Sequence, residues 1–383
     1  MTSRITWDEA SARRYGRQLL RTPAQSGTSV AEVVSTLLAT HAQVLSAAEL
    51  SVALRLDGST RQDVRSALWD DRSLVKTYGP RGTVHLLAAA ELPFWSAALT
   101  AVPSGPGPAP ADVRMTPEQE EQVVAAIGDA LDGCELTIDE LSEEVVARTG
   151  PWAGDLVMEA FQGKWPRWRQ VMHRAGQSGA LCFAPDRGRK AAYTRPPRFD
   201  PLPADRALAE LVHHYLRAYG PATPQHFAKW AAAPRGWAGG LFASLASSGD
   251  IEEVDFEGVP AWVVAGDTDF PDEAVRGVRL LPYFDAYAIA AQPRERMFPG
   301  AAYGRALAGG QAGNYPVLLV DGVVAGVWHQ RRRGKRTTVT VELLGSLTGA
   351  QEKELGEQVE RVGEVLEALP ELVVGKVTTG PHA

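Results

Sequence analysis

The first hundred residues carry apolar side chains at helical spacing, followed by a short stretch in which the spacing changes to alternation. This spacing predicts helices over residues 10–20, 29–38, 47–54 and 61–70. Glu9 stands three residues after Thr6, which is the pattern of a capping box at a helix start. Two strands are predicted within residues 74–87, around the turn Gly79-Pro80-Arg81-Gly82. Helices closed by a small hairpin are typical of a winged helix.

The same order of helices and then a hairpin occurs twice more along the chain. The second copy has predicted helices at 136–149 and 168–176 and strands at 180–183 and 191–193. The third has predicted helices at 207–219, 224–231 and 238–247 and strands at 251–256 and 261–264. Proline-rich linkers at 103–110 and 196–203 separate the copies. The sequence therefore predicts three modules, at residues 1–102, 111–196 and 203–268.

After residue 266 the pattern changes to short β-branched and apolar runs. Strands are predicted at 278–281, 317–320, 323–328 and 337–344, joined by turns such as Asp321-Gly322. Residues 350–369 predict an acidic amphipathic helix that packs on these strands. The fold class expected is α+β: three tandem winged-helix modules followed by a C-terminal β-rich unit, residues 276–383, with a terminal helix.

Composition is ordinary for a globular protein of several domains, with 383 residues, 45% hydrophobic and 22% charged. The cysteines, Cys134 and Cys182, lie far apart without metal-ligand spacing, which fits a reducing cytosol. No apolar run approaches the roughly 18 residues that a membrane span needs, and the N-terminal residues lack a signal core. We expect a cytoplasmic protein that makes no contact with membranes.

The net charge of −7 hides a strong segregation of charge along the chain. Residues 101–161 carry 2 basic and 13 acidic side chains, whereas residues 162–198 carry 9 basic and 1 acidic. A protein with concentrated basic strips can bind phosphates while remaining acidic overall. Charge runs also arise on solvated helix faces, so segregation by itself is weak support for a nucleic-acid partner.

The densest basic strip is His329-Gln330-Arg331-Arg332-Arg333-Gly334-Lys335-Arg336, between two predicted strands. Mutual repulsion makes such a tip most favourable against a polyanion, so the predicted DNA contacts are Arg331, Arg332, Arg333, Lys335 and Arg336. The alternative is a solvated turn that protects an edge strand from aggregation. Weaker candidates stand at the tip of the second module's hairpin: Arg187, Arg189 and Lys190. Trp165 and Trp168, three residues apart, are interpreted as core anchors rather than base-stacking residues.

The candidate for chemistry is His41-Ala42-Gln43, a polar string between two apolar runs. In extended or turning backbone, residues 41 and 43 point the same way and could hold one water molecule. The alternative is a helix junction with two incidentally satisfied polar groups. The chain has no phosphate-binding loop, dinucleotide fingerprint, zinc-protease motif or nucleophile elbow. His213 and His214 are adjacent on a predicted helix and make a poor metal pair, so neither metal nor cofactor is expected.

In its order of motifs the chain resembles the bacterial winged-helix DNA glycosylases of the AlkZ type. The resemblance covers nearly the whole chain and rests on these stretches: Arg81-Gly82-Thr83-Val84-His85-Leu86, Tyr219-Gly220-Pro221-Ala222-Thr223 with Phe227 and Trp230, Leu280-Leu281-Pro282-Tyr283-Phe284-Asp285, and Val320-Asp321-Gly322-Val323-Val324-Ala325-Gly326-Val327-Trp328. The family's site signature is Gln, an apolar residue, then Gln or Asp, in the loop after the second helix. Here that loop reads His41-Ala42-Gln43, so His41 departs from the commoner first Gln.

The resemblance implies excision of N7-alkylated purines, including bulky or crosslinked N7-guanine adducts made by genotoxic antibiotics. His41 and Gln43 would then be catalytic, and the enzyme would be a monofunctional glycosylase that uses water and no cofactor. Its partner would be double-stranded DNA carrying alkylated bases, with no obligate protein partner, and a monomer is expected. The alternative is a winged-helix DNA-binding protein without catalysis, either a transcription regulator or an inactive relative.

Overall fold

The structure is a computed structural model that describes residues 3–103, 105, 109–160 and 163–382. The chain forms two compact units, and each is described by itself. Unit 1 comprises residues 1–67, 212–227 and 239–383, and unit 2 comprises residues 68–211 and 228–238. Part of the predicted linker 103–110 lies outside the described residues. None of the described helices is long and apolar enough to cross a membrane.

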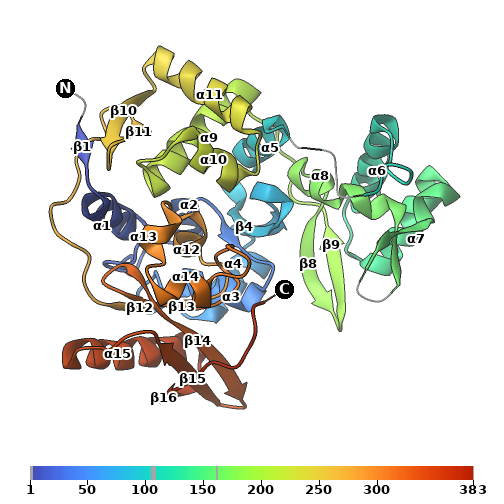
Figure 1. Cartoon of the computed structure of the whole chain (residues 1–383). Coiled ribbons are helices and arrows are strands. Elements are labelled where there is room, and N and C mark those ends of the chain that lie inside the picture. Colours follow the sequence, from blue (N-terminus) through green and yellow to red (C-terminus); the bar gives the residue numbers. More distant parts are fainter. Residues whose placement is uncertain (1–2, 104, 106–108, 161–162, 383) are drawn as a thin grey trace. The chain divides into compact units, whose positions relative to one another are not determined.

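The elements of unit 1 come from both ends of the chain (Figure 1). Its helices are α1 (Trp7–Arg17), α2 (Val30–Thr36), α3 (Leu45–Ala53), α12 (Ala286–Ala290), α13 (Arg294–Met297), α14 (Ala301–Ala306) and α15 (Gly349–Leu366). Its strands are β1 (Arg4–Ile5), β2 (Thr40–His41), β10 (Ile251–Phe256), β11 (Val259–Val264), β12 (Val278–Leu281), β13 (Val317–Val320), β14 (Val323–Arg333), β15 (Arg336–Leu343) and β16 (Leu369–Val374).

The elements of unit 2 follow the middle of the chain, and four helices cross the division between the units. Unit 2 contains β3 (Leu74–Tyr78), β4 (Val84–Ala88), α5 (Leu92–Ala101), α6 (Pro117–Ala130), β5 (Leu136–Thr137), α7 (Ile138–Thr149), β6 (Leu156–Glu159), β7 (Lys164–Pro166), α8 (Met172–Gln177), β8 (Cys182–Arg187) and β9 (Lys190–Thr194). The helices that cross the division are α4 (Arg61–Trp69), α9 (Ala204–Tyr219), α10 (Pro224–Ala231) and α11 (Arg235–Ser248).

These elements confirm an α+β chain with helices followed by a hairpin in each of the three predicted segments. The assignment of these segments as winged-helix modules stays a prediction. The capping box at Thr6 and Glu9 is present, but α1 begins at Trp7 and ends at Arg17, three residues before the predicted end. The predicted helix at 168–176 is a 3₁₀ turn, Arg167–Val171, followed by α8. Sequence patterns missed α5, α6 and the three short helices α12–α14.

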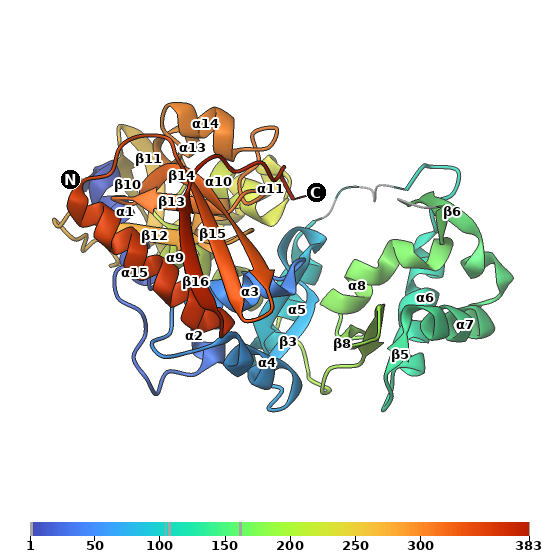
Figure 2. The same ribbon diagram turned by 90° about the horizontal axis from the view of Figure 1, so that it is seen from below.

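The C-terminal sheet has five strands in the order β12-β13-β14-β15-β16, and α15 contacts β12 and β16 (Figure 2). The first four strands are antiparallel, and β16 adds to β15 in parallel. The prediction that the last helix reaches residue 369 was wrong. Glu367 adopts a left-handed φ of 52°, which ends α15, and Leu369 then begins the edge strand β16. Strand β14 also continues five residues beyond the predicted 328, to Arg333.

A fully buried ion pair within unit 1 joins residues 55 and 285, which lie far apart in the sequence. Arg55, just after α3, donates two hydrogen bonds of 2.8 Å to the two carboxylate oxygens of Asp285, and both side chains are 0% exposed. Ser51 donates a further bond of 2.7 Å to Asp285, which also caps α12 by accepting from the Tyr287 N–H. Arg55 Nε donates to the carbonyl of Gln18 at the end of α1. One pair therefore fixes α1, α3 and α12 together.

The terminal helix α15 supports the same region from another side. Arg361 Nη2 donates to the carbonyls of Ala53, Leu56 and Ser59 at distances of 2.8–2.9 Å. Ala53 is the last residue of α3, and Leu56 and Ser59 lie in the segment that follows it. Arg361 of α15 thus holds the end of α3 and the segment after it.

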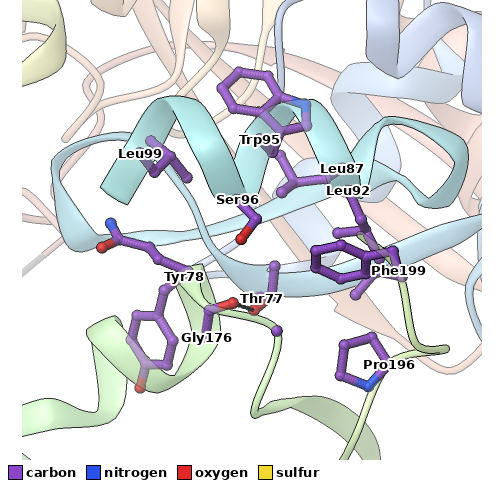
Figure 3. Close-up of a pocket in the computed structure, with 13 residues that line it drawn as sticks. Thr77, Tyr78, Leu87, Leu92, Trp95, Ser96, Leu99, Gly176, Pro196 and Phe199 are labelled. Atoms are coloured by element: carbon purple, nitrogen blue, oxygen red, sulfur yellow. Dashed lines mark hydrogen bonds between the residues drawn. The ribbon is translucent and has the colours of Figure 1, made fainter. Parts of the chain in front are cut away.

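A small pocket lies within unit 2, among β3, β4, α5 and α8 (Figure 3). Figure 3 shows Thr77, Ser96 and Phe199 around the same space. A Cβ at Gly176 would lie 2.7 Å from the Tyr78 ring, so the glycine allows α8 to approach β3 closely. No carboxylate or imidazole lines this pocket, and it holds none of the candidate chemistry.

We predict that Asp285→Asn lowers the free energy of unfolding by about 3 kcal/mol, because it leaves the buried Arg55 charge without its counter-ion. Urea denaturation followed by tryptophan fluorescence measures the loss. Glu273→Gln is the matched control, since it breaks the exposed pair with Arg21 and is expected to change stability by less than about 1 kcal/mol. Equal losses in the two variants would contradict the central role of the buried pair.

Candidate active site

The predicted catalytic string lies between α2 and α3, where β2 provides two residues of extended backbone. Thr40 and Ala42 are 1% and 0% exposed, whereas His41 is half-buried and Gln43 is exposed. This alternation is what extended backbone requires, because successive side chains point to opposite faces. It places the side chains of residues 41 and 43 on the more open side, as the spacing predicts.

The backbone that leads into this loop is strained. Leu38 and Ala39 have φ values of 54° and 75°, a left-handed conformation that costs residues with a Cβ about 1 kcal/mol or more. Both side chains are buried, which holds the conformation in place. The preceding carbonyl, that of the buried Leu37, accepts a 2.7 Å hydrogen bond from the Tyr219 hydroxyl. Tyr219 therefore holds the strained turn from a distant part of the chain.

An aromatic contact sets the surroundings of His41. The ring of Phe284 lies 4.4 Å from the His41 ring, with an angle of 33° between the planes. Phe284 itself has a left-handed φ of 56°, and its N–H donates a 2.8 Å bond to the carbonyl of Gly313. The next residue is Asp285, whose carboxylate is clamped by Arg55. The buried ion pair thus fixes the backbone that brings Phe284 to the candidate imidazole.

Burial also acts on the tyrosines of this region. Burial, reinforced by the neighbouring Tyr315, raises the pKa of Tyr283. Desolvation raises the pKa of the buried Tyr287 to about 12, although a hydrogen bond with Ser11 opposes the shift. Both phenols remain protonated at neutral pH and act here as neutral groups.

The basic hairpin lies where β14 ends at Arg333 and β15 begins at Arg336. Arg331, Arg333, Lys335 and Arg336 are exposed, and none of them has an ion pair among the described residues. Arg331 and Arg333 share one face of β14, since side chains alternate along a strand. Arg332 points to the other face, where its Nη1 donates to the carbonyl of Leu366 at the end of α15. One of the predicted DNA contacts thus also supports the fold.

The cations at the second predicted contact, the β8–β9 hairpin, differ in their surroundings. Arg187 pairs with Glu140, and Lys190 Nζ lies 2.6 Å from a carboxylate oxygen of Asp139, so α7 neutralises both. Arg189 is exposed at the tip and has no ion pair among the described residues. All three stay predicted DNA contacts, but only Arg189 presents an uncompensated charge there.

The two tryptophans of the neighbouring basic strip have different environments. Trp168 is 0% exposed and donates from Nε1 to the Ser142 hydroxyl, as expected of a core anchor. Trp165 is 40% exposed, and the guanidinium of Arg169 lies 4.2 Å from its ring centre. The prediction of a core position is confirmed for Trp168 and wrong for Trp165, because the β6–β7 hairpin carries Trp165 outward.

No group of three or more His, Cys, Asp or Glu side chains within the described ranges could hold a metal ion. Sequence reasoning missed four residues of the site: Tyr219, Phe284, Arg55 and Asp285. A signal existed for three of them, because Tyr219, Phe284 and Asp285 belong to the stretches that carry the family resemblance. Arg55 gave none, since one arginine at a helix end has no distinctive pattern.

An exposed amide and an imidazole on a strained loop, in a chain that also presents a cationic hairpin, are features of a DNA-processing enzyme. Residues 34–365 match the family described as DNA glycosylase AlkZ-like. Over 342 residues the chain is 31% identical to a Streptomyces sahachiroi protein named interstrand DNA cross-link repair glycosylase, covering 85% of this chain and 88% of that protein.

A solved structure of the Streptomyces sahachiroi DNA glycosylase AlkZ is similar as well. It matches with a TM-score of 0.78 and 27% identity, over 97% of this chain and 100% of that one. The chain belongs to the AlkZ-like DNA glycosylase family. It is therefore an enzyme that acts on DNA, and the alternative of a winged-helix DNA-binding protein without catalysis, whether a regulator or an inactive relative, is set aside.

We predict that Tyr219→Phe lowers the free energy of unfolding by about 1–2 kcal/mol, because the buried Leu37 carbonyl loses its donor. The relaxed turn should also slow base release by roughly tenfold, since small misplacements at a site are costly. Urea denaturation and a single-turnover glycosylase assay measure the two effects. Tyr303→Phe removes a hydroxyl from a side chain that is 49% exposed and serves as the control. A Tyr219→Phe enzyme indistinguishable from this control would contradict the role assigned to the hydroxyl.

Proposed function

We propose that this protein is a monofunctional DNA glycosylase that hydrolyses the N-glycosidic bond of N7-alkylated purines. The substrates proposed are bulky or crosslinked N7-guanine adducts of a genotoxic antibiotic, so the enzyme would serve self-resistance and base excision repair. The observation that carries the proposal is the loop at residues 40–43, which turns His41 and Gln43 to its more open side. The name of the Streptomyces sahachiroi relative, a cross-link repair glycosylase, supports the choice of lesion class.

The chemistry asks little of the protein at the leaving group. A guanine alkylated at N7 is cationic, so it departs as a neutral base without protonation by a general acid. Bond cleavage then passes through an oxocarbenium-like state at the sugar, as in other glycoside hydrolysis. What remains for the enzyme is to deliver water to C1′ and to accept its proton.

His41 and Gln43 are suited to that task. The amide oxygen of the exposed Gln43 can accept a hydrogen bond from the water and orient it toward C1′. The His41 imidazole can orient the same water or take its proton, since imidazole is the common general base of enzymes near neutral pH. Since water is the nucleophile, the product is an abasic site and no covalent enzyme–DNA intermediate forms.

The exposed cations of the β14–β15 hairpin would bind the DNA phosphates. The exposed arginines of β14 present a compact positive charge, which favours contact with the backbone or insertion into a groove. The partner proposed is double-stranded DNA carrying alkylated bases, with no obligate protein partner. A monomer suffices, because one chain supplies both the loop and the hairpin.

We predict base release from oligonucleotides that carry N7-methylguanine or one bulky N7-guanine adduct, detected as strand breaks after alkali treatment. His41→Ala and Gln43→Ala should each lower the single-turnover rate by roughly a hundredfold, the scale of a lost proton-transfer or water-positioning group. Kd for DNA should change less than about twofold, because neither side chain supplies phosphate charge.

Ser46→Ala is the matched control, since Ser46 is exposed at the start of α3 and is expected to leave the rate unchanged. No strand break above the no-enzyme background on either lesion would remove the proposed activity. A Gln43→Ala enzyme as fast as the wild type would remove the water site while leaving the activity standing.

We predict that Arg331→Ala with Arg333→Ala weakens DNA binding and reduces the slope of log K against log salt by about 2, from about 0.9 per lost phosphate contact. Fluorescence anisotropy over a salt series measures the slope. Arg332→Ala removes one positive charge, from the opposite face of β14, and is expected to change the slope by less than the roughly 0.9 of one phosphate contact, because its guanidinium binds the Leu366 carbonyl. An unchanged slope in the double variant would take the hairpin out of the interface.

A further inference from the structure

We propose that His382, close to the C-terminus, is a positioning residue of the active site that holds Phe284 against His41. This inference rests on the proposed function, because it concerns the geometry of the proposed catalytic imidazole. It draws a segment more than three hundred residues away in sequence into the site.

The rings form a continuous chain of contacts. Phe284 lies 4.4 Å from His41, and the His382 ring meets Phe284 at 5.5 Å with an angle of 81°. His382 also meets Tyr283 at 5.3 Å and 62°. Edge-to-face arrangements of this kind are the favourable geometry for aromatic rings. His382 therefore limits the positions that Phe284 can take beside His41.

Backbone hydrogen bonds hold His382 and Phe284 to one short segment, Gly313-Asn314. The N–H of His382 donates to the carbonyl of Asn314 at 2.9 Å, and the N–H of Phe284 donates to the carbonyl of Gly313 at 2.8 Å. A Cβ on Gly313 would lie 3.2 Å from the Phe284 Cα, so glycine permits this close approach. The neighbouring carbonyls of Gly313 and Asn314 thus fix the backbone of Phe284 relative to that of His382.

The segment that leads to His382 is anchored rather than loose. Val377 is 6% exposed, its N–H donates to Glu342 at 2.8 Å, and its carbonyl accepts from Arg305 at 2.9 Å. Arg305 also donates two hydrogen bonds to Glu342, and these bonds lower the pKa of that carboxyl, so the anchor stays charged at neutral pH. Val377, five residues before His382, is therefore fixed, and this limits where the His382 side chain can lie.

The His382 imidazole makes ring contacts with Tyr283 and Phe284. Its Nδ1 is buried and has no hydrogen-bond partner among the described residues. A phenyl ring at this position would keep the edge contact with Phe284 and would break no hydrogen bond of Nδ1. This separates a positioning role, which Phe can fill, from proton transfer, which it cannot.

The test compares His382→Ala with His382→Phe by two readouts. The first is the single-turnover rate of base release from N7-methylguanine DNA, together with Kd for the same DNA. The second is the set of His41 ring signals in protein with ¹³C-labelled histidine, assigned by their loss in His41→Gln. The Phe284 ring, with its centre 4.4 Å from that of His41, shifts these signals through its ring current. Val373→Ala, at a site 40% exposed on β16, is the control.

We expect His382→Ala to lower the rate by about tenfold, on the scale of a misplaced catalytic group. Kd should remain within about twofold because His382 supplies no phosphate charge. The His41 signals should move, and His382→Phe should restore both the rate and the signals. Val373→Ala should change neither readout.

Three results would overturn the inference: a wild-type rate in His382→Ala, a lowered rate with unmoved His41 signals, or no rescue by His382→Phe. If the wild-type enzyme releases no base at all, the proposed function fails. The His41 signals then still decide whether His382 positions the imidazole, so the two failures can be told apart.

Discussion

The ion pair between Arg55 and Asp285 is the interaction on which the arrangement around the active-site loop depends. Removing two charges from water is costly and is repaid only when hydrogen bonding is complete. Here Asp285 accepts from Arg55, Ser51 and the Tyr287 N–H, and Arg55 also reaches the Gln18 carbonyl. The pair can form only when the N-terminal helices and residues 276–383, both parts of unit 1, are assembled together. Loop geometry is therefore coupled to the folding of all of unit 1.

That coupling explains how a strained loop persists. Leu38, Ala39 and Phe284 all adopt left-handed backbone without being glycine. Each conformation is unfavourable alone and is retained because surrounding contacts over-determine it. Tyr219 fixes the turn before the loop, and Asp285 fixes the turn that carries Phe284. Rigid support of this kind suits a site whose task is to place one water molecule, because positioning is then prepared before the substrate binds.

The positions of the basic residues could be predicted from the sequence, whereas their contacts could not. The cations of the β14–β15 hairpin were found by counting, and all five are exposed. Counting did not reveal that Arg332 binds the end of α15, or that Arg187 is paired with Glu140. Strand β14 was predicted too short for a related reason. Its last residues are charged on both faces, so the apolar alternation stops while the backbone ladder with β15 continues.

The sequence by itself determined the α+β class, most helix and strand positions, the basic hairpin and the polar string at residues 41–43. These follow from local periodicity, turn residues and charge density, which act over a few neighbouring positions. Only the tertiary structure decided what surrounds the string: the Phe284 stack, the Tyr219 hydroxyl, the Arg55–Asp285 pair and the approach of His382. These contacts join residues that lie far apart in the chain, and their free energy exists only after burial, so no local pattern records them.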